Sequence, residues 1–128
     1  MNPRAEKLKT RTKQFALDVI RFVGGLPRLP ATDVIGRQLL KSGTGIAANY
    51  RSACRSRSHA EFVARIGIVL EEADESEFWL ELLAESGLPN VVVGPTLLGE
   101  SRELRAIFAA SNLTARRVGH SQAGRSDR

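Results

Sequence analysis

The chain has 128 residues, a length that fits one domain, and a formal net charge of +5 at pH 7. Its 42% of hydrophobic and 26% of charged residues are ordinary for a globular domain, and no apolar run approaches the roughly 18–20 residues of a membrane-spanning helix. No apolar signal segment follows the basic N-terminus, one cysteine excludes an internal disulfide, and two histidines leave little material for a metal site. We therefore expect a cytoplasmic protein without a cofactor or a membrane partner.

Residues 5–23 are predicted to form the first amphipathic helix. The side chains expected in the core recur at steps of three and four: Leu8, Thr12, Phe15, Val19 and Phe22. The sequence Gly24-Gly25-Leu26-Pro27 is expected to end this helix, because paired glycines favour leaving a helix and proline cannot continue one.

Residues 33–54 are predicted to form the second helix, with Thr32 as its N-cap. Its core stripe is Ile35, Leu39, Gly43, Ile46 and Tyr50. Gly43 and Gly45 stand inside the helix, where each costs roughly 1 kcal/mol relative to alanine. Two such glycines indicate close approach by another backbone, or alternatively a kink.

The third and fourth helices complete the predicted fold. Ser58 and Glu61 have capping-box spacing and open a helix that runs to about residue 86. Gly94-Pro95 opens a fourth helix that ends near Arg117, and the polar residues 118–128 are predicted to be a disordered tail. The core residues expected on these helices are Phe62, Ile66, Val69, Ala73, Leu80 and Leu83, then Leu97, Leu104, Phe108 and Ser111. Residues 1–117 should therefore form one all-α domain, an antiparallel up-and-down four-helix bundle.

Charge is divided sharply along the chain. Residues 58–86 carry one cation, Arg65, against eight acids, and the segments before and after them are basic. Phosphate contacts require only positive side chains on one surface, so a basic chain is a candidate for binding nucleic acid. The candidate nucleic-acid-binding residues are Arg4, Lys7, Lys9, Arg11, Lys13, Arg51, Arg55 and Arg57. No base-stacking aromatic lies among them, so binding should have little sequence specificity.

Alternatively, these basic residues form ion pairs with acidic residues of the protein itself. The acids of the third helix can form ion pairs with Arg37, Lys41 or Arg51 of the second helix, inside the bundle or across subunits. If instead the basic residues of the first two helices form one exposed band, binding of RNA or DNA is favoured.

The patterns typical of catalysis are weak. The segment from Gly36 to Ser42 has only one glycine of a P-loop and lies inside a helical pattern. Cys54 and His59 are candidates for a nucleophile and its base, but no orienting acid is near them in the sequence. The acids lack the Glu-x-x-His motif of dimetal bundles. We therefore expect a protein that is not an enzyme, with no catalytic, cofactor-binding or metal site.

A combination of short motifs between Arg37 and Leu83 is specific. They are Gln38, Lys41-Ser42-Gly43-Thr44, Ala48-Asn49-Tyr50-Arg51, Ser56-Arg57, Glu61-Phe62, Glu72, Asp74, Glu75 and Trp79-Leu80. This pattern resembles the four-helix bundle proteins related to those encoded in 23S ribosomal RNA intervening sequences. The run Asn49-Tyr50-Arg51-Ser52-Ala53 departs from the Asn-Ile-Ala-Glu-Gly usual in those members.

The resemblance implies an up-and-down bundle that assembles into a ring, typically a homopentamer, with no known enzymatic activity. A related accessory protein of diversity-generating retroelements binds a reverse transcriptase and nucleic acid through a basic surface, which by analogy favours RNA or DNA here. The protein is thus expected to be a non-enzymatic homo-oligomer that binds RNA or DNA weakly. The alternative is a protein-only scaffold or accessory subunit that docks to a protein such as a reverse transcriptase.

The predicted oligomer interface combines a small, polar stripe of the second helix with acids of the third. Acidic and basic helices offer complementary surfaces for head-to-tail contacts between subunits. The interface residues predicted are Arg37, Gln38, Lys41, Ser42, Gly45, Asn49, Glu72 and Glu75.

Overall fold

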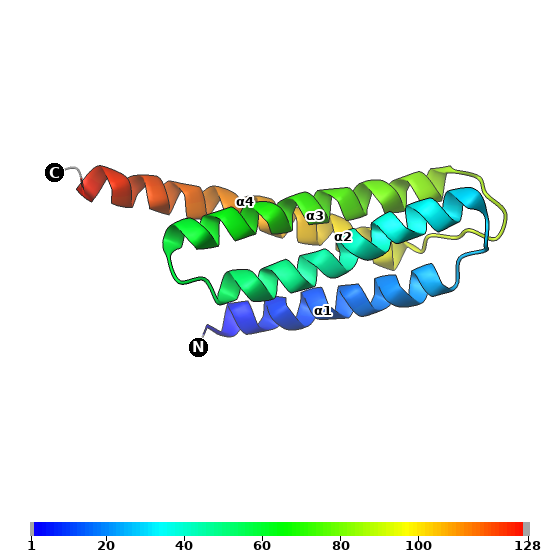
Figure 1. The fold of residues 1–128 in the computed structure, drawn as a ribbon, viewed down its shortest axis with the longest axis horizontal. Helices are drawn as coiled ribbons and strands as arrows, with labels where there is room; N and C mark the ends of the chain where they lie inside the picture. The colour runs from blue at the N-terminus through cyan, green and yellow to red at the C-terminus, as the bar shows by residue number, and fades with distance from the viewer. Residues whose placement is uncertain (1, 127–128) are drawn as a thin grey trace.

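The structure is a computed structural model that describes residues 2–126, with side chains as far as Gly119. Four helices follow in order, α1 (Pro3–Gly24), α2 (Pro30–Cys54), α3 (His59–Glu85) and α4 (Pro95–Ser126), and these described residues contain no strand. Successive helices run in opposite directions and pack side by side (Figure 1). The prediction of an all-α, up-and-down four-helix bundle is confirmed.

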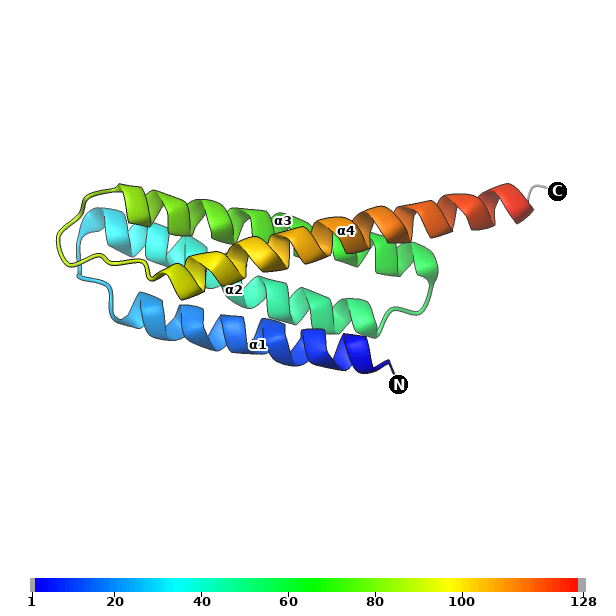
Figure 2. The same cartoon turned by 180° about the vertical axis from the view of Figure 1, so that it is seen from behind.

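The bundle is open between its first and last helices. Helices α1 and α4 meet over only a short stretch, whereas each consecutive pair of helices packs along much of its length. Helix α4 diverges from α1 and projects beyond the end of the bundle at which α1 begins (Figures 1 and 2).

Local capping signals determine where the helices begin. The Asn2 side chain accepts a hydrogen bond from the Arg4 backbone N–H at 2.9 Å, ahead of Pro3 in the first turn of α1. Ser58 caps α3 as predicted, since its Oγ accepts from the Glu61 N–H at 3.1 Å. The Glu61 carboxylate accepts from the Arg57 N–H at 3.1 Å rather than completing the expected capping box with Ser58.

The predicted start of the second helix is wrong. Helix α2 begins at Pro30, and its N-cap is Leu29 rather than Thr32. Thr32 is buried in the first turn, where its hydroxyl accepts from the Leu29 N–H at 3.0 Å. Proline is well tolerated in the first helical turn, because its missing N–H would have had no partner there.

The fourth helix is longer than predicted. Helix α4 continues past Arg117 to Ser126, so residues 118–126, predicted as part of a disordered tail, end the helix in the structure. After Pro95 no further proline interrupts the sequence, so α4 continues although Gly119 and Gly124 have low helix propensity. Residues 127 and 128 of the predicted tail lie outside the described residues.

The core contains most of the predicted stripe on each helix. The fully buried large side chains include Phe15, Val19, Leu39, Ile46, Ile66, Val69, Leu80, Leu83, Leu104 and Phe108. Burial of one such side chain stabilises the fold by about 1.5–3 kcal/mol relative to its exposure to water. Two of the buried hydroxyls are paired between helices, since the Ser76 Oγ donates to the Ser42 Oγ at 2.9 Å.

The two glycines of α2 have different neighbours. A Cβ placed at Gly43 would lie 2.9 Å from the Val19 Cγ2, so this glycine permits the close approach of α1 that the sequence indicated. A Cβ at Gly45 would lie 2.7 Å from Glu72 Oε2, so the second glycine accommodates a carboxylate of α3.

Candidate functional site

Exposed cations gather at the end of the bundle where α1 begins and α2 ends. This end also carries the α2–α3 turn and the later turns of α4, so segments far apart in the sequence lie together there (Figure 1). Their cationic side chains are all exposed to solvent. We call this region the basic end, and define it by Arg4, Lys7, Arg51, Arg55, Arg57, Arg116 and Arg117.

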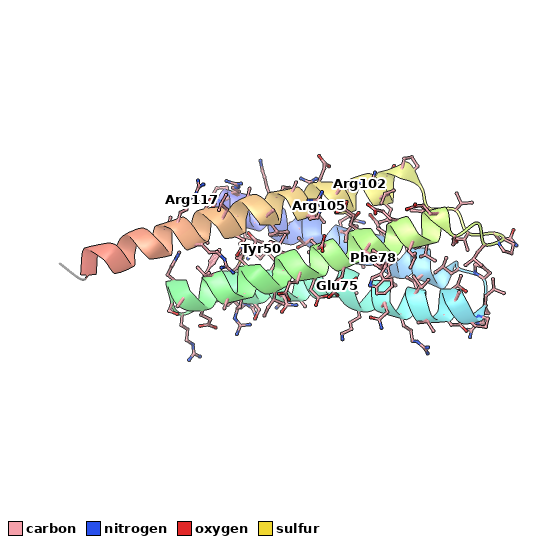
Figure 3. All side chains as sticks on the ribbon, turned by 90° about the horizontal axis from the view of Figure 1, so that it is seen from above. Tyr50, Glu75, Phe78, Arg102, Arg105 and Arg117 are labelled. Atoms are coloured by element: carbon pink, nitrogen blue, oxygen red, sulfur yellow. The ribbon has the colours of Figure 1, made fainter. Side chains whose placement is uncertain are left out.

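The basic end contains cations that sequence reasoning missed. Arg116 and Arg117 lie on the part of α4 that reaches this end, and Figure 3 labels Arg117 there. The sequence pattern gave no reason to group them with Arg55, because only the antiparallel return of α4 brings residues so distant in sequence together.

Three of the predicted nucleic-acid-binding residues are placed differently. Lys9 forms an ion pair with Glu6 on its own helix, with 2.6 Å between Nζ and Oε1. Arg11 is part of the contact between α1 and α4 and is described below. Lys13 is exposed but lies further along α1, outside the basic end.

Arg11 joins α1 to α4 through two carboxylates. Its Nη2 lies 2.6 Å from Glu100 Oε1 and 2.9 Å from Glu103 Oε2, and its Nε donates to Glu100 Oε2 at 2.8 Å. The hydrogen bonding that Arg11 donates to Glu100 is the main reason that the pKa of Arg11 is raised. Because of this bidentate pair, Arg11 stabilises the contact between α1 and α4 and is not a free cation on the surface.

The acids of α3 do not pair with α2 in the described structure. Glu77 forms ion pairs with Arg105 and Arg102 of α4, and Arg102 also approaches Glu81 at 3.4 Å. Figure 3 shows Arg102 and Arg105 on α4, alongside α3. The predicted pairing with Arg37, Lys41 or Arg51 is therefore wrong within one bundle, where α4 supplies cations to the adjacent flank of α3, and pairing across subunits stays a prediction. Among the described residues, no acid of α3 forms an ion pair with a cation of the basic end.

Glu72 occupies an unusual position between α2 and α3. Its Oε2 is buried and has no hydrogen-bond partner among the described residues, and it faces Gly45. Burial raises the pKa of Glu72; Glu75 raises it further, and Lys41 opposes the shift. A buried carboxylate oxygen without a partner is costly, so this group is poised to gain from a donor supplied by another molecule.

Around Glu72 lies a surface that mixes acids with exposed apolar groups. Phe78 is 53% exposed, and its ring meets Trp79 edge-on at a centroid distance of 5.1 Å. The Trp79 Nε1 is also buried without a hydrogen-bond partner in the described range. Helical spacing places Phe78 on the side of α3 away from the core, whereas Trp79 lies at its edge and also packs against the core. We call this surface the outer face and define it by Gln38, Lys41, Gly45, Ile68, Glu72, Glu75, Phe78, Trp79 and Leu82.

The predicted interface residues divide between this outer face and the interior. Arg37, Gln38, Lys41 and Glu75 are exposed. The Asn49 Nδ2 donates to the Gly45 carbonyl at 2.8 Å, within α2. Ser42 corrects the prediction, because it is 1% exposed and hydrogen-bonded inside the bundle, where it cannot contact a neighbouring subunit.

The candidate nucleophile and base weighed from the sequence do not form a catalytic arrangement in the described contacts. Cys54 is exposed, and the His59 Nε2 lies 2.8 Å from the Ala115 carbonyl oxygen of α4, a hydrogen bond that fixes the ring. Within residues 2–126 no group of three potential metal ligands comes together. No helix in that range is both apolar enough and long enough to cross a membrane.

Comparisons with known proteins agree on one family. The family model described as 23S rRNA-intervening sequence protein matches residues 6–110. A solved structure from Bacteroides thetaiotaomicron, described as a protein with unknown function from the S23 ribosomal protein family, is 30% identical to this chain. The match has a TM-score of 0.71 and covers 81% of this chain and 96% of that one. No curated protein matches the chain.

Proposed function

The chain belongs to the 23S rRNA-intervening sequence protein family, and from that premise we propose that it is a non-enzymatic, cytoplasmic homo-oligomer that binds RNA or DNA weakly through its basic end. The observation that carries the proposal is the gathering of seven exposed cations from three helices and one turn at a single end of the bundle. The α3 acids that form ion pairs do so elsewhere: Glu77 and Glu81 with α4, and Glu61 with Arg65 of its own helix.

Binding of this kind is electrostatic. A phosphate backbone releases counterions when cations contact it. The logarithm of the binding constant therefore falls with the logarithm of the salt concentration, with a slope of roughly 0.9 per phosphate contact on a DNA duplex. The basic end presents arginines, which bind phosphate oxygens through two parallel hydrogen bonds and carry no sequence information by themselves. Low sequence specificity follows.

Self-assembly is supported by the outer face. A second subunit would cover the exposed Phe78, and it could supply a donor to Glu72 once this side chain rotates outward, since its Oε2 is buried without a partner among the described residues. A surface of different composition lies on α1, where Leu17 and Ile20 are also exposed. Two unlike patches suit a head-to-tail contact that closes into a ring, and the pentamer is the ring that the family resemblance implies. A ring would repeat the basic end around its axis and raise the avidity for one strand.

The outer face also favours a second candidate function. An accessory subunit that docks a protein partner such as a reverse transcriptase would use the same exposed aromatic and acidic groups, because interface cores are rich in aromatic side chains. Light scattering after size-exclusion chromatography separates the two candidates, since occupation by a second copy gives an oligomer and a free outer face gives a monomer.

The basic end is tested by charge removal with a matched control. The double variant Arg55→Ala/Arg57→Ala removes two cations from the basic end, and Arg21→Ala/Arg28→Ala removes two exposed cations near the α1–α2 turn at the other end. Binding to labelled duplex RNA and DNA is measured by fluorescence anisotropy across a salt series. We expect the first variant to lose affinity and to lower the salt slope by roughly two, and the control to change neither. Equal losses in both variants, or wild-type binding that does not respond to salt, would contradict the proposal.

A further inference from the structure

A cavity of about 800 Å³ opens at the basic end, between α1 and the diverging part of α4. Its volume lies within the range of about 300–1,000 Å³ that small-molecule sites occupy. The cavity has side chains from all four helices in its walls, among them Leu8, Tyr50, Phe62, Ile66 and Ala115. It is therefore a gap in the bundle, continuous with the surface that carries the free cations.

The lining of the cavity is mainly apolar but includes several hydroxyl groups. The Ser56 Oγ is buried and has no hydrogen-bond partner among the described residues. Tyr50 is 6% exposed and lines the same space, next to the thiol of Cys54. Burial raises the pKa of Tyr50, and the neighbouring Cys54 adds to the shift. A tyrosine hydroxyl is neutral at pH 7 with or without such a shift, and it can donate or accept a hydrogen bond. Ser111 and Thr114 of α4 add two further hydroxyls to the wall.

This composition discriminates between classes of ligand. An alkyl chain would cover the hydroxyls without satisfying them, which is unfavourable. A planar heteroaromatic ring would lie against the apolar lining, which includes Phe62 and Tyr50, and the donors and acceptors on its edges would offer partners to the hydroxyls there. Arg4, Glu6 and Lys9 line the cavity, and because Lys9 is paired with Glu6 the three together leave one net positive charge, that of the exposed Arg4. This charge suits an anionic group attached to such a ring.

We infer that the cavity receives one unpaired nucleotide of a bound single strand, with its base between the helices and its phosphate near Arg4. The inference rests on the proposed function, because the neighbouring phosphates of the strand would contact the basic end. It adds a preference that electrostatics alone does not give: a duplex has no unpaired base to insert, so a single strand should bind more tightly than a duplex of the same length.

The experiment fills the cavity by substituting an exposed residue at its edge with a larger one. Thr114 is exposed and lines the cavity, so Thr114→Trp places an indole into the space with little disturbance of the core. Ala106 is exposed on the same helix and away from the cavity, so Ala106→Trp is the matched control. Tyr50→Phe removes only a hydroxyl and conserves the buried ring. Each variant is titrated with an adenosine dodecamer, with its duplex against a uridine dodecamer, and with adenosine monophosphate.

We expect the wild-type protein and Ala106→Trp to prefer the single strand by about tenfold, the scale of one base stacked or inserted. Thr114→Trp should bring single-strand affinity down to the duplex value without changing duplex affinity, and Tyr50→Phe should reduce the preference several-fold. The inference is overturned if Thr114→Trp keeps the preference or if both tryptophan variants lose it equally. If neither strand binds the wild-type protein, the proposed function fails. The titration with adenosine monophosphate then tests the cavity by itself. If the wild-type protein binds adenosine monophosphate and Thr114→Trp does not, the cavity is still supported as a nucleotide site. If the wild-type protein does not bind adenosine monophosphate, the inference is overturned.

Discussion

Gly43 and Gly45 should respond with opposite sign to the same substitution, although they stand two residues apart on α2. Replacing a glycine inside a helix by alanine stabilises it by about 1 kcal/mol, because alanine loses less conformational freedom on folding. At both positions the new Cβ meets a neighbour closer than 3.0 Å. The outcome depends on whether that neighbour can move.

At Gly43 the neighbour cannot move. The Cβ would lie 2.9 Å, 3.0 Å and 3.2 Å from three carbons of Val19, which is fully buried and β-branched. A valine in a helix has one strongly preferred rotamer, so the clash must be relieved by shifting α1 against α2, at about 1–3 kcal/mol. After the gain in helix propensity, Gly43→Ala should destabilise the fold by about 1 kcal/mol.

At Gly45 the neighbour is the end of a flexible side chain. The Cβ would lie 2.7 Å from Glu72 Oε2 and 3.0 Å from its Cδ, and rotation of Glu72 outward relieves both contacts. That rotation also returns an unpartnered carboxylate oxygen to water. Gly45→Ala should therefore stabilise the fold by about 1 kcal/mol, so that the two variants differ by about 2 kcal/mol.

Urea unfolding followed by circular dichroism measures this difference. With an m-value of about 1–3 kcal/mol per molar urea, the two midpoints should be about 1 M apart, on either side of the wild-type midpoint. Because Gly45 lies on the outer face, the series is repeated at several protomer concentrations, which separates folding from assembly. A Gly43→Ala midpoint at or above that of Gly45→Ala would refute the reasoning from these contacts.

Three further variants probe the polar contacts. Glu72→Gln should increase the free energy of unfolding at pH 7 and have no effect below pH 4.5. The pKa of Glu72 in the folded state is raised above the ordinary 4.5, so the wild-type protein loses stability as the pH rises from 4.5 through the folded-state pKa. A pH series of urea midpoints in which the wild-type protein shows no such loss relative to Glu72→Gln would contradict the assignment. Arg11→Met removes the contact to Glu100 and should destabilise by about 0.5–1 kcal/mol, with a smaller effect in molar salt; an equal effect at both salt concentrations would mean that packing, not charge, matters at this position. Ser42→Ala should cost about 1 kcal/mol, whereas adding Ser76→Ala should cost little more in the same thermal or urea assay, and fully additive losses would count against a shared hydrogen bond.

The fold could be predicted because local sequence signals mark where the helices begin or end. Gly24-Gly25, Ser58 and Pro95 mark ends or starts locally, and the apolar spacing of three and four identifies the buried face without knowledge of the partners. The role predicted for Thr32 is wrong because a threonine before a helical pattern is typical of an N-cap, and only the structure shows that the first turn begins two residues earlier, at Pro30.

The candidate site was less accessible to the sequence, because it depends on which helices become neighbours. Arg11 looked like one of several equivalent cations on α1 until α4 placed Glu100 and Glu103 against it. The acids of α3 were expected to face α2, but Glu77 has its cations on α4. Periodicity predicts that a residue is on a surface, and not which other helix supplies the opposite charge.

The sparse packing between α1 and α4 has a dynamic consequence. Helix α4 packs mainly on α3, and the ion pairs that Arg11 of α1 makes are with Glu100 and Glu103 in the N-terminal part of α4. Segments with few stabilising neighbours open locally before the molecule unfolds as a whole, so backbone amides late in α4 should exchange with deuterium well ahead of those in α2. Local opening of α4 would widen the entrance of the cavity that Tyr50 lines, and it would be more frequent than opening of the other helices. A molecule bound in the cavity would then slow hydrogen exchange in α4 alone.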